Sequence, residues 1–449
     1  MPYPPRVPDV PGSPASAARL RDPLDYLYSL EKLGIKFGLD NIRRMLAALG
    51  SPHEAFRSVV IAGTNGKGSV TAMVEHALRA AGFRAARYTS PHLVRLEERF
   101  FVDGAPVETG LMRDLAGRVQ DVVGALIERG QLETHPTFFE ATTAMAFELF
   151  RQRGAEIAVC EVGLGGRLDS TNVVTPVATA ITSIDLDHQT FLGQTIAEIA
   201  YEKAGIIKPG VPVVLGATGQ EASRVVERVC REQGARLVRA RDEVEVRTTR
   251  RPDGRLAMDL TTPAGAYPTV TLGLRGRHQV ENAVTAVRLL EQLHEFPVPE
   301  AALAAGLSGV NWPGRLDLIE AGQGRSVLLD SAHNPSGAAA LAAYLAEFHP
   351  APLPIVFGVM QDKDAEEMLR ALRTRASAFV FTAPAMTRAT PPTELLAIAS
   401  RVAPDVPAEA SASPAAALEH GWRRGPLLCA AGSIFLVGDL LDLLSRPDV

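Results

Sequence analysis

The alternation of short apolar runs with helix-like stretches constrains the fold of this chain more than any other sequence feature. Runs rich in valine, isoleucine and alanine recur along its 449 residues, such as "SVVIAG", "EIAVCEVG", "VPVVLG", "PIVFGVM" and "PLLCAAGS". Between them lie stretches such as "VTAMVEHALRAAG" and "SGAAALAAYLAEFH", whose apolar residues return every three or four positions. Strands that alternate with helices form parallel sheets of βαβ units, so we predict an α/β protein.

The string "VVIAGTNGKGSVTAM" predicts an anion-binding turn in one of these strand–helix units. A strand ending at Ala62 and a helix beginning near Ser69 leave "GTNGKG" as a tight turn, whose NH groups would face one anion. Lys67 can reach outer phosphates, and Ser69 offers magnesium a hydroxyl. Ile61 and Gly68 depart from the generic phosphate-loop pattern. The alternative is an ordinary glycine-rich turn, but three glycines, an asparagine and a lysine in six residues favour a phosphate loop.

Two interruptions divide the chain. From about residue 234 to 274, short alternating strands around a "PDG" turn predict an antiparallel appendage. Further on, "GVNWPGRLDLIE" precedes a new βα series, so we place the domain linker near Gly309 to Arg315. We expect a flexible extension over residues 1–20, a P-loop-type N-terminal domain with a parallel sheet over 21–310, and a Rossmann-like α/β C-terminal domain over 311–449.

Composition bears on the class of function. The formal net charge of -5 gives no overall reason to bind nucleic acid or a membrane surface, so small molecules are the expected partners. Three widely separated cysteines argue against a disulfide framework, and Cys160 is expected in the core. The proline-rich N-terminus lacks the apolar stretch of a signal peptide, and no segment offers about 18 uninterrupted apolar residues. We expect a cytoplasmic monomer.

The full string "AGTNGKGS" is more specific than a generic phosphate loop. It resembles the folylpolyglutamate synthase and dihydrofolate synthase family of the bacterial bifunctional type, relatives of the Mur peptidoglycan ligases. Similar segments follow in the family's order, among them "LGIKFGLDN", "YTSPHLVRLEERF", "EVGLGGRLDSTNVV", "PGRLDLI", "LDSAHNP" and "AGSIFLVG". The resemblance implies an ATP-dependent ligase of folate biosynthesis that adds L-glutamate to dihydropteroate and to reduced folates through an acyl phosphate. It also implies that the C-terminal domain is a glutamate ligase domain.

Amide-bond formation sets chemical requirements on such a site. A carboxylate lacks a leaving group, and ATP supplies one by converting the carboxylate to an acyl phosphate. The site therefore needs a phosphate loop, Mg2+, a clamp for the acid and a pocket for the amine. The resemblance implies ATP as co-substrate and two Mg2+ ions. The expected ATP-binding residues are Thr64, Asn65, Gly66, Lys67, Gly68, Ser69, Asn282, Arg315 and Asp330.

Three residues match the family's magnesium ligands, namely Ser90, Glu161 and His188. Magnesium favours oxygen ligands, and Glu161 ends a buried apolar run, where a carboxylate is costly without a cation. A salt bridge is the alternative role for Glu161. Histidine is a less usual magnesium ligand, so on chemistry alone His188 suits the role of a base or hydrogen-bond donor equally well.

Lys203 in "YEKAGIIKPG" matches a lysine that is carbamylated in the family. Carbamylation turns a cation into an oxygen-bearing anion, which could support a second magnesium ion. We therefore expect Lys203 to be modified in this way. An unmodified lysine that binds phosphate is the alternative.

The remaining nucleotide site comes, by resemblance, from the C-terminal half and the segment leading into it. Asn282 offers an amide to adenine or phosphate, Arg315 a guanidinium to the transferring phosphoryl group, and Asp330 a carboxylate to ribose hydroxyls. His333 is placed for the incoming amine, whose ammonium must lose a proton; we expect a positioning role, with general base as the alternative. The expected catalytic residues are Lys67, His188, Lys203, Arg315 and His333.

The acid substrate is expected at three segments that match dihydropteroate-binding segments of the family. A flat pterin suits an aromatic ring such as Phe139 and a carboxylate such as Asp169. Phe138 and Phe139 are alternatively core residues, and we expect one of them to be. Arg388 is the candidate for the carboxylates of glutamate, with a solvated surface arginine as the alternative. The expected folate-binding residues are Ile35, Lys36, Phe37, Thr137, Phe138, Phe139, Glu140, Leu168, Asp169 and Ser170.

Two rival functions remain open at this point. A Mur-type ligase has the same chemistry with a UDP-linked substrate, but it would normally carry an additional N-terminal domain, and only about sixty residues precede the loop. A nucleotide-binding protein without ligase activity leaves "LDSAHNP" and "AGSIFLVG" unexplained.

Overall fold

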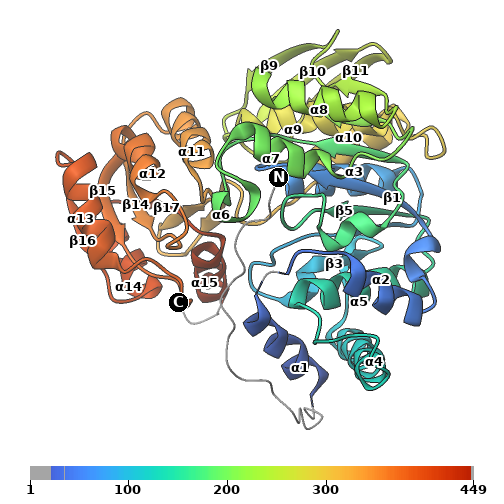
Figure 1. Ribbon diagram of the computed structural model, residues 1–449. Helices are drawn as coiled ribbons and strands as arrows, with labels where there is room; N and C mark the ends of the chain where they lie inside the picture. The colour runs from blue at the N-terminus through green and yellow to red at the C-terminus, as the bar shows by residue number, and fades with distance from the viewer. Residues whose placement is uncertain (1–21, 35, 446–449) are drawn as a thin grey trace.

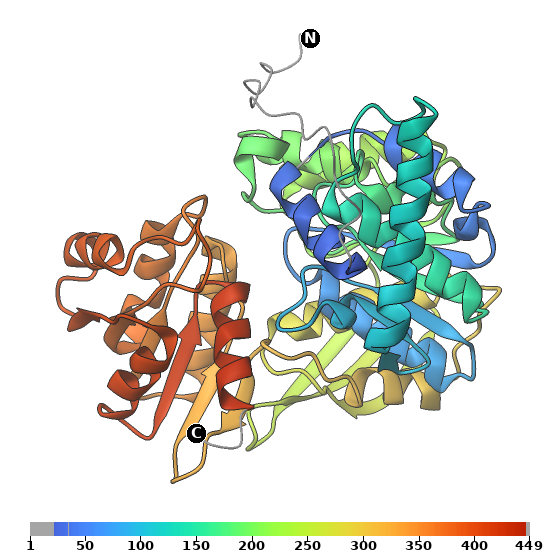
Figure 2. The same ribbon diagram turned by 90° about the horizontal axis from the view of Figure 1, so that it is seen from below.

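The computed structural model describes residues 22–34 and 36–445 and places them in two bodies (Figure 1 and Figure 2). The extension expected over residues 1–20 and the predicted folate-binding residue Ile35 lie outside the described residues. One body is built on an eight-stranded sheet and the other on a six-stranded sheet. The predicted α/β class is confirmed.

The eight-stranded sheet carries the phosphate loop. In spatial order its strands are β4 (Ala105–Pro106), β3 (Phe100–Val102), β2 (Ala85–Tyr88), β5 (Ile157–Glu161), β1 (Arg57–Ala62), β6 (Ala178–Ile181), β7 (Val213–Leu215) and β8 (Leu237–Arg239). The six strands from β2 to β8 in this order run parallel to one another. Strand β3 pairs antiparallel with β2 on one side and with β4 on the other. Ile61 of β1 pairs with Glu161 of β5 and with Ala180 of β6. The carboxyl ends of the three central strands therefore meet at one edge, where ligands bind in open α/β sheets.

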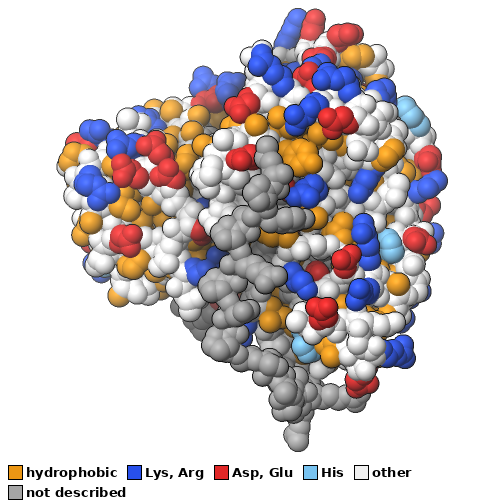
Figure 3. Space-filling model, in the orientation of Figure 1, with side chains coloured by type: hydrophobic (Ala, Val, Ile, Leu, Met, Phe, Trp, Pro, Cys, Tyr) orange, Lys and Arg blue, Asp and Glu red, His pale blue; other side chains and the backbone are white. Residues whose placement is uncertain are grey.

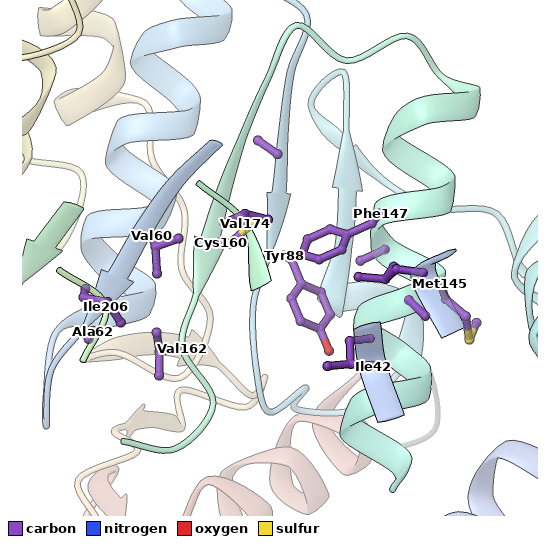
Figure 4. Close-up of a cluster of buried hydrophobic side chains, with 14 of the residues drawn as sticks. Ile42, Val60, Ala62, Tyr88, Met145, Phe147, Cys160, Val162, Val174 and Ile206 are labelled. Carbon is purple, nitrogen blue, oxygen red and sulfur yellow. The ribbon is translucent and has the colours of Figure 1, made fainter. Parts of the chain in front are cut away.

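Helices cover both faces of this sheet because alternate residues of the central strands point to opposite sides. Val60 and Ala62 pack with Tyr88, Phe147 and other residues of a first core, part of which Figure 4 shows, and the predicted core residue Cys160 lies there as well. The helices on that face are α1 (Pro23–Ser29), α2 (Asp40–Ala48), α4 (Thr109–Glu128), α5 (Phe138–Gln152), α7 (Ile196–Ala204) and α8 (Gln220–Glu232).

Val59 and Ile61 face a second core on the other side of the sheet. It is covered by α3 (Lys67–Ala80), α9 (His278–Leu290), α10 (Glu300–Ser308) and the antiparallel strands β9 (Glu245–Arg250), β10 (Leu256–Thr262) and β11 (Gly265–Thr271). These three strands are the predicted appendage, with the "PDG" turn between β9 and β10. The predicted start near residue 234 was too early, because β8 pairs with β7 and completes the main sheet.

The second body repeats this arrangement on a smaller scale. Its strands are, in spatial order, β12 (Asp317–Glu320), β13 (Ser326–Leu329), β17 (Leu427–Ala431), β14 (Leu353–Phe357), β15 (Ala376–Phe381) and β16 (Ala408–Ala410). Only β12 is antiparallel to its neighbour. The helices are α11 (Pro335–Phe348), α12 (Ala365–Leu372) and α13 (Pro392–Val402) on one face, and α14 (Pro414–Trp422) and α15 (Ile434–Leu444) on the other.

The two bodies are in direct contact. A Cβ on Gly438 of α15 would collide with the backbone of Leu93, and α15 lies at the junction in both ribbon views (Figure 1 and Figure 2). The chain crosses between the bodies from the end of α10 at Ser308 to the start of β12 at Asp317. None of the helices among the described residues is long and apolar enough to cross a membrane. Charges of both signs are mixed on the face drawn in Figure 3.

Candidate active site

The glycines of the phosphate loop are required by both conformation and space. Gly63 has a φ angle of 150° and Gly66 one of 84°, values that residues with side chains rarely adopt. A Cβ on Gly63 would collide with Thr182 Oγ1, and one on Gly66 would collide with Asn282 Oδ1. The loop is therefore in contact with the segment that follows β6 on one side and with α9 on the other.

Hydrogen bonds fix the loop to the segment that follows β6. The backbone NH of Thr64 donates to the Ser183 carbonyl at 2.7 Å, and Thr182 Oγ1 donates to the Asn65 carbonyl at 2.6 Å. The NH of Asn65 donates to Ser183 Oγ at 3.0 Å. The loop is thus held in place before any ligand binds.

Helix α3 begins at Lys67, two residues before the predicted start at Ser69. The prediction was wrong because Gly66, in the left-handed conformation, already serves as the N-cap. Lys67 therefore lies in the first helical turn. Its ammonium turns back to the loop and donates to the carbonyls of Gly63 and Thr64 at 3.1 and 3.2 Å.

A cavity of about 500 Å³ lies above this loop and is lined by residues of both bodies. This volume is in the range of small-molecule sites, about 300 to 1,000 Å³. The predicted site residues that line it are Thr64, Asn65, Gly66, Lys67, Gly68, Ser69, Ser90, Glu161, His188, Asn282, Arg315, Asp330, His333 and Arg388. Arg388 is exposed at this cavity, so its glutamate-binding role stays a prediction.

Lys67 and Arg315 both face the cavity, and neither has a carboxylate partner among the described residues. The hydrogen bonds of Lys67 go to the loop carbonyls, and Arg315 Nη1 donates to the Gly314 carbonyl at 3.2 Å. Across residues 22–34 and 36–445, no Asp or Glu oxygen lies within 4.0 Å of either cation. Burial lowers the pKa of Arg315, which the charges of Asp330 and Glu161 oppose. Both cations are available to an anionic ligand such as a nucleotide phosphate.

Glu161 is the complementary feature, a buried carboxylate without a cation partner. It is 6% exposed and accepts a hydrogen bond from the backbone NH of Ser90 at 3.3 Å. Burial raises the pKa of Glu161, and the charge of Lys67 opposes this effect. The part of the chain that is described offers Glu161 no ion pair within 4.0 Å, so the salt-bridge alternative is not supported.

The residues at this point fit a magnesium ion. Glu161 offers carboxylate oxygens and Ser90 a hydroxyl, and both line the cavity with His188. No cluster of three or more His, Cys, Asp or Glu among the described residues could hold a metal. Mg2+ usually keeps several waters and binds one or two carboxylates together with substrate phosphates, so this small donor set is adequate.

The environment of His188 keeps its ring neutral near pH 7. Burial lowers the pKa of His188 to about 4, the charge of Asp187 raises it, and the charge of Lys363 lowers it again. The backbone of His188 is left-handed, with a φ angle of 49°, and its Nε2 lies 3.4 Å from Lys363 Nζ. A neutral imidazole can act as a ligand, an acceptor or a base.

Lys203 lies in α7 and does not line the cavity, but its side chain contacts the phosphate loop. Its side chain is buried, and Nζ donates to the Gly63 carbonyl at 2.9 Å, the same oxygen that Lys67 contacts. Burial and the charge of Lys67 lower the pKa of Lys203 to about 7. A substantial fraction of the amine is therefore neutral at physiological pH, which is the form that reacts with carbon dioxide.

Asp330 has a structural role that the sequence did not reveal. One of its oxygens accepts from the Leu316 NH and the other from the Ala332 NH, both at 2.9 Å. The carboxylate thereby fixes the linker to the second body, while Asp330 still lines the cavity. His333 Nδ1 donates to the Ser331 carbonyl at 2.9 Å, and His333 also lines the cavity.

Asp187 and its partners are site residues that sequence reasoning missed. Asp187 Oδ1 forms a 2.5 Å ion pair with Lys363, and Oδ2 accepts from Asn334 Nδ2 at 3.0 Å and lies 3.6 Å from His333 Nε2. Asn334 Nδ2 also donates to Asn65 Oδ1 of the phosphate loop at 3.0 Å. The available sequence signal was that Asp187 immediately precedes the predicted site residue His188.

The predicted folate-binding residues that are described lie outside the lining of this cavity. Thr137 and Glu140 form a capping box at the start of α5, so the Glu140 carboxylate is already engaged. Asp169 caps a short helix over Ser170–Val173 and accepts from the NH groups of Leu164 and Thr171.

One of the two phenylalanines of this segment is a core residue, as expected. Phe138 is buried in the first core, whereas Phe139 is partly buried. Gly163 lines the cavity, and a Cβ on it would lie 2.6 Å from Phe139 Cζ. The Phe139 ring therefore packs against a residue of the cavity lining. Lys36 and Phe37 are exposed, and Leu168 is partly buried. The folate-binding role of these residues stays a prediction.

Two protein-family models match the chain. The Mur ligase middle domain matches residues 61–290, and the glutamate ligase domain of the Mur ligases matches residues 314–434. The first match begins in β1 and ends with α9, and the second begins just before Arg315. Together with a nucleotide-type cavity between two α/β bodies, these matches define an ATP-dependent ligase of the Mur class.

Similar proteins narrow the class to one family. A Bacillus subtilis protein named dihydrofolate synthase/folylpolyglutamate synthase is 35% identical over 368 residues, which cover 80% of this chain and 84% of that protein. A Mycobacterium tuberculosis protein of the same name is 37% identical over 350 residues, 74% of this chain and 72% of that one. The chain belongs to the folylpolyglutamate synthase/dihydrofolate synthase family. It spans 50% of a longer Haloferax volcanii relative, named a probable bifunctional folylpolyglutamate synthase/dihydropteroate synthase, to which it is 35% identical over 438 residues, 95% of this chain.

Solved structures agree with this assignment. The structure of Mycobacterium tuberculosis folylpolyglutamate synthase complexed with ADP and AMPPCP superposes with a TM-score of 0.87 at 32% identity, covering 95% of this chain and 99% of that one. An E. coli FolC structure in complex with DHPP and ADP gives a TM-score of 0.83 at 27% identity, covering 95% and 98%. The resemblance inferred from the sequence motifs is confirmed.

Proposed function

We propose that this chain is an ATP-dependent ligase that adds L-glutamate to dihydropteroate and to reduced folates through an acyl phosphate. The observation that carries the proposal is the cavity between the bodies, in which, among the described residues, Lys67 and Arg315 have no carboxylate partner and Glu161 has no cation partner. Family membership and relatives whose structures contain ADP support the nucleotide as co-substrate. Location in the cytoplasm and a monomeric state stay predictions.

In the proposed mechanism, the phosphate loop binds the ATP phosphates through backbone NH groups at the start of α3, and Lys67 contacts the outer phosphates. Arg315 lines the same cavity, where it would stabilise charge on the phosphoryl group as it moves to the acid. Glu161, Ser90 and His188 would hold Mg2+, whose chemistry here is charge neutralisation on the phosphates. The acyl carbon is then attacked by the glutamate amine, and inorganic phosphate leaves.

The amine must arrive unprotonated at the activated acid. His333 lines the cavity, and its Nε2 lies 3.6 Å from Asp187 Oδ2. A histidine in that position can accept the proton of the incoming ammonium or orient the amine. Arg388, exposed at the same cavity, has the geometry to bind a carboxylate of glutamate in two hydrogen bonds.

Product mass analysis tests the proposed function directly. The protein is incubated with ATP, Mg2+, L-glutamate and either dihydropteroate or tetrahydrofolate, and each reaction is expected to yield the acid plus one glutamate with one ADP. A parallel reaction with a UDP-muramoyl substrate tests the Mur-type rival. ATP binding without glutamate-dependent ADP would instead favour a non-catalytic nucleotide-binding protein, and one product without the other would restrict the proposal to one synthase activity.

Lys203→Ala is expected to lower the rate of ligation on the order of a hundredfold, the upper range for groups that support a metal site. The reason is that we propose a carbamate on Lys203, next to the phosphate loop, as an anion that helps to organise a second Mg2+. Short carboxylic acids such as acetate should restore part of the activity of Lys203→Ala, because they supply a carboxylate at the vacated position. Lys208→Ala, which removes a partly buried lysine outside the cavity lining, is the control. Full activity in Lys203→Ala, or the absence of rescue, would contradict the modification.

A further inference from the structure

Gly68 is the residue at which the phosphate loop departs from the generic pattern, and the structure provides a steric reason. Gly68 is the second residue of α3, where almost any other residue would be a better helix former. A Cβ on Gly68 would lie 2.8 Å from Trp312 Cζ2 and 3.1 Å from its Cε2 and Nε1. These atoms belong to a rigid ring, so relief requires movement of the whole side chain. The indole of Trp312 rests on the backbone of Gly68.

Trp312 also lies next to the buried guanidinium of Arg87, which forms an ion pair with a residue of α3. The guanidinium carbon of Arg87 lies 5.0 Å from the centroid of the indole and 3.8 Å from that of the Phe101 ring. Arg87 is buried and forms a 3.2 Å ion pair with Glu75 of α3. The helix that carries the phosphate loop therefore contacts Trp312 through Gly68 and, by way of Glu75, supports the cation beside it.

The chain beyond Trp312 leads directly to the cavity and to the second body. Arg315 follows three residues later and lines the cavity. The backbone on both sides of Arg315 is fixed, since the Gly314 carbonyl accepts from the Ser331 NH at 2.8 Å and the Leu316 NH donates to Asp330 at 2.9 Å. Leu316 has a φ angle of 47°, which is unusual for leucine and leaves this segment few alternative paths. Trp312 is therefore joined to Arg315 by a short segment whose far end is fixed to the second body.

We infer that Trp312 is a positioning residue for phosphoryl transfer. Seated on Gly68, it sets the position of Arg315 and of the C-terminal body relative to the phosphate loop. On this inference, position 68 must be glycine because Trp312 of the linker packs against it, and not because the nucleotide needs the space. The inference rests on the proposed function only where it states that Arg315 contacts the transferred phosphoryl group. The packing of the Trp312 indole on Gly68 does not depend on the substrates.

A double-mutant cycle separates these two requirements. Gly68→Ala and Trp312→Ala are each expected to lower kcat for glutamate-dependent ADP formation on the order of tenfold, with KM for ATP changed less than about twofold. In the Trp312→Ala background, Gly68→Ala should add less than about twofold, because the ring that it displaces is already gone. Multiplicative losses, or losses that appear in KM for ATP, would overturn the inference and return Gly68 to direct contact with the nucleotide.

Tryptophan emission provides a readout without acid substrate or glutamate. Trp312 and Trp422 are the two tryptophans of the chain, so Trp422→Phe leaves Trp312 as the only emitter. Adding Gly68→Ala to Trp422→Phe should shift the emission to longer wavelength, because the displaced indole meets more water. An unshifted emission would overturn the inference even if ligation is confirmed, and a shift would support it even if the ligase activity fails. Gly124→Ala is the matched control, since a Cβ there on helix α4 meets nothing within 4 Å and should leave kinetics and emission unchanged.

Discussion

Lys67→Ala is expected to abolish ligation with dihydropteroate and with tetrahydrofolate alike. The ammonium of Lys67 is held by two loop carbonyls at 3.1 and 3.2 Å, without a carboxylate partner among the described residues, so its charge is available to the outer phosphates. Loss of a group that stabilises charge in the transition state costs about a hundredfold to a thousandfold in rate. We expect the upper end, because the other cations that line the cavity, Arg315, Lys363 and Arg388, lie on different segments and cannot take the place of Lys67.

The measurement is ADP formation with and without glutamate, together with product mass. Lys32→Ala, which removes an exposed lysine distant in sequence from the loop, is the control and should retain the rate of the unaltered protein. Thermal unfolding of both variants shows whether the fold is retained. Product formation by Lys67→Ala above about a tenth of the original rate would overturn the assignment of "GTNGKGS" as the ATP site, since phosphate-binding lysines contribute far more than that.

The alternation of apolar runs predicted the interior strands of both sheets because those strands are buried on both faces. Such strands read as continuous apolar sequence, and β1, β5, β7, β14 and β17 all follow the quoted runs. The edge strands β4, β12 and β16 and the adjacent β3 were missed because they are two to four residues long and exposed in part. Their pairing depends on tertiary neighbours, which local sequence does not encode.

The site was predictable to the extent that it is built at the ends of parallel strands. Residues that follow β1, β5 and β6 must meet at one sheet edge, so Lys67, Glu161 and His188 could be grouped without a structure. The contacts of Asp187 with Lys363 and of Gly68 with Trp312 could not be predicted, because each joins segments more than 170 residues apart. Glu140 had a local signal, the capping-box spacing from Thr137, that competed with its proposed role as a ligand.

Asp187→Ala is expected to lower the rate of ligation by about two to four orders of magnitude. Asp187 and Lys363 are 6% and 8% exposed in their side chains and form the buried ion pair that joins the two bodies. Removing one partner of such a pair leaves an uncompensated charge and costs about 3 to 5 kcal/mol. Here the cost falls on the closed arrangement of the bodies, which is the arrangement that brings Arg315 and His333 to the phosphate loop.

The charge of Asp187 should persist over the whole working pH range. Burial raises the pKa of this carboxyl, but contact with His333 and the charges of His188 and Lys363 hold the pKa well below its usual range. A depressed carboxyl pKa stabilises the folded state above the ordinary value of about 3.9, and this contribution is lost only as the pH falls through the folded pKa. The difference between Asp187→Ala and the unaltered protein should therefore be constant from about pH 5 to 8, and a difference that vanishes within that interval would contradict the ion pair.

A second ion pair between the bodies provides the matched control. Arg277 Nη2 lies 2.8 Å from Glu347 Oε1, but the arginine side chain is 61% exposed. Exposed pairs contribute about 0 to 1 kcal/mol, so Arg277→Ala should change the rate by less than about fivefold. Protease cleavage of the linker over residues 309–316, followed with and without ADP, should be faster in Asp187→Ala and unchanged in Arg277→Ala. Equal effects of the two variants on rate and cleavage would show that the bodies are held together by their contact area, in which case Asp187 has no special role in closure.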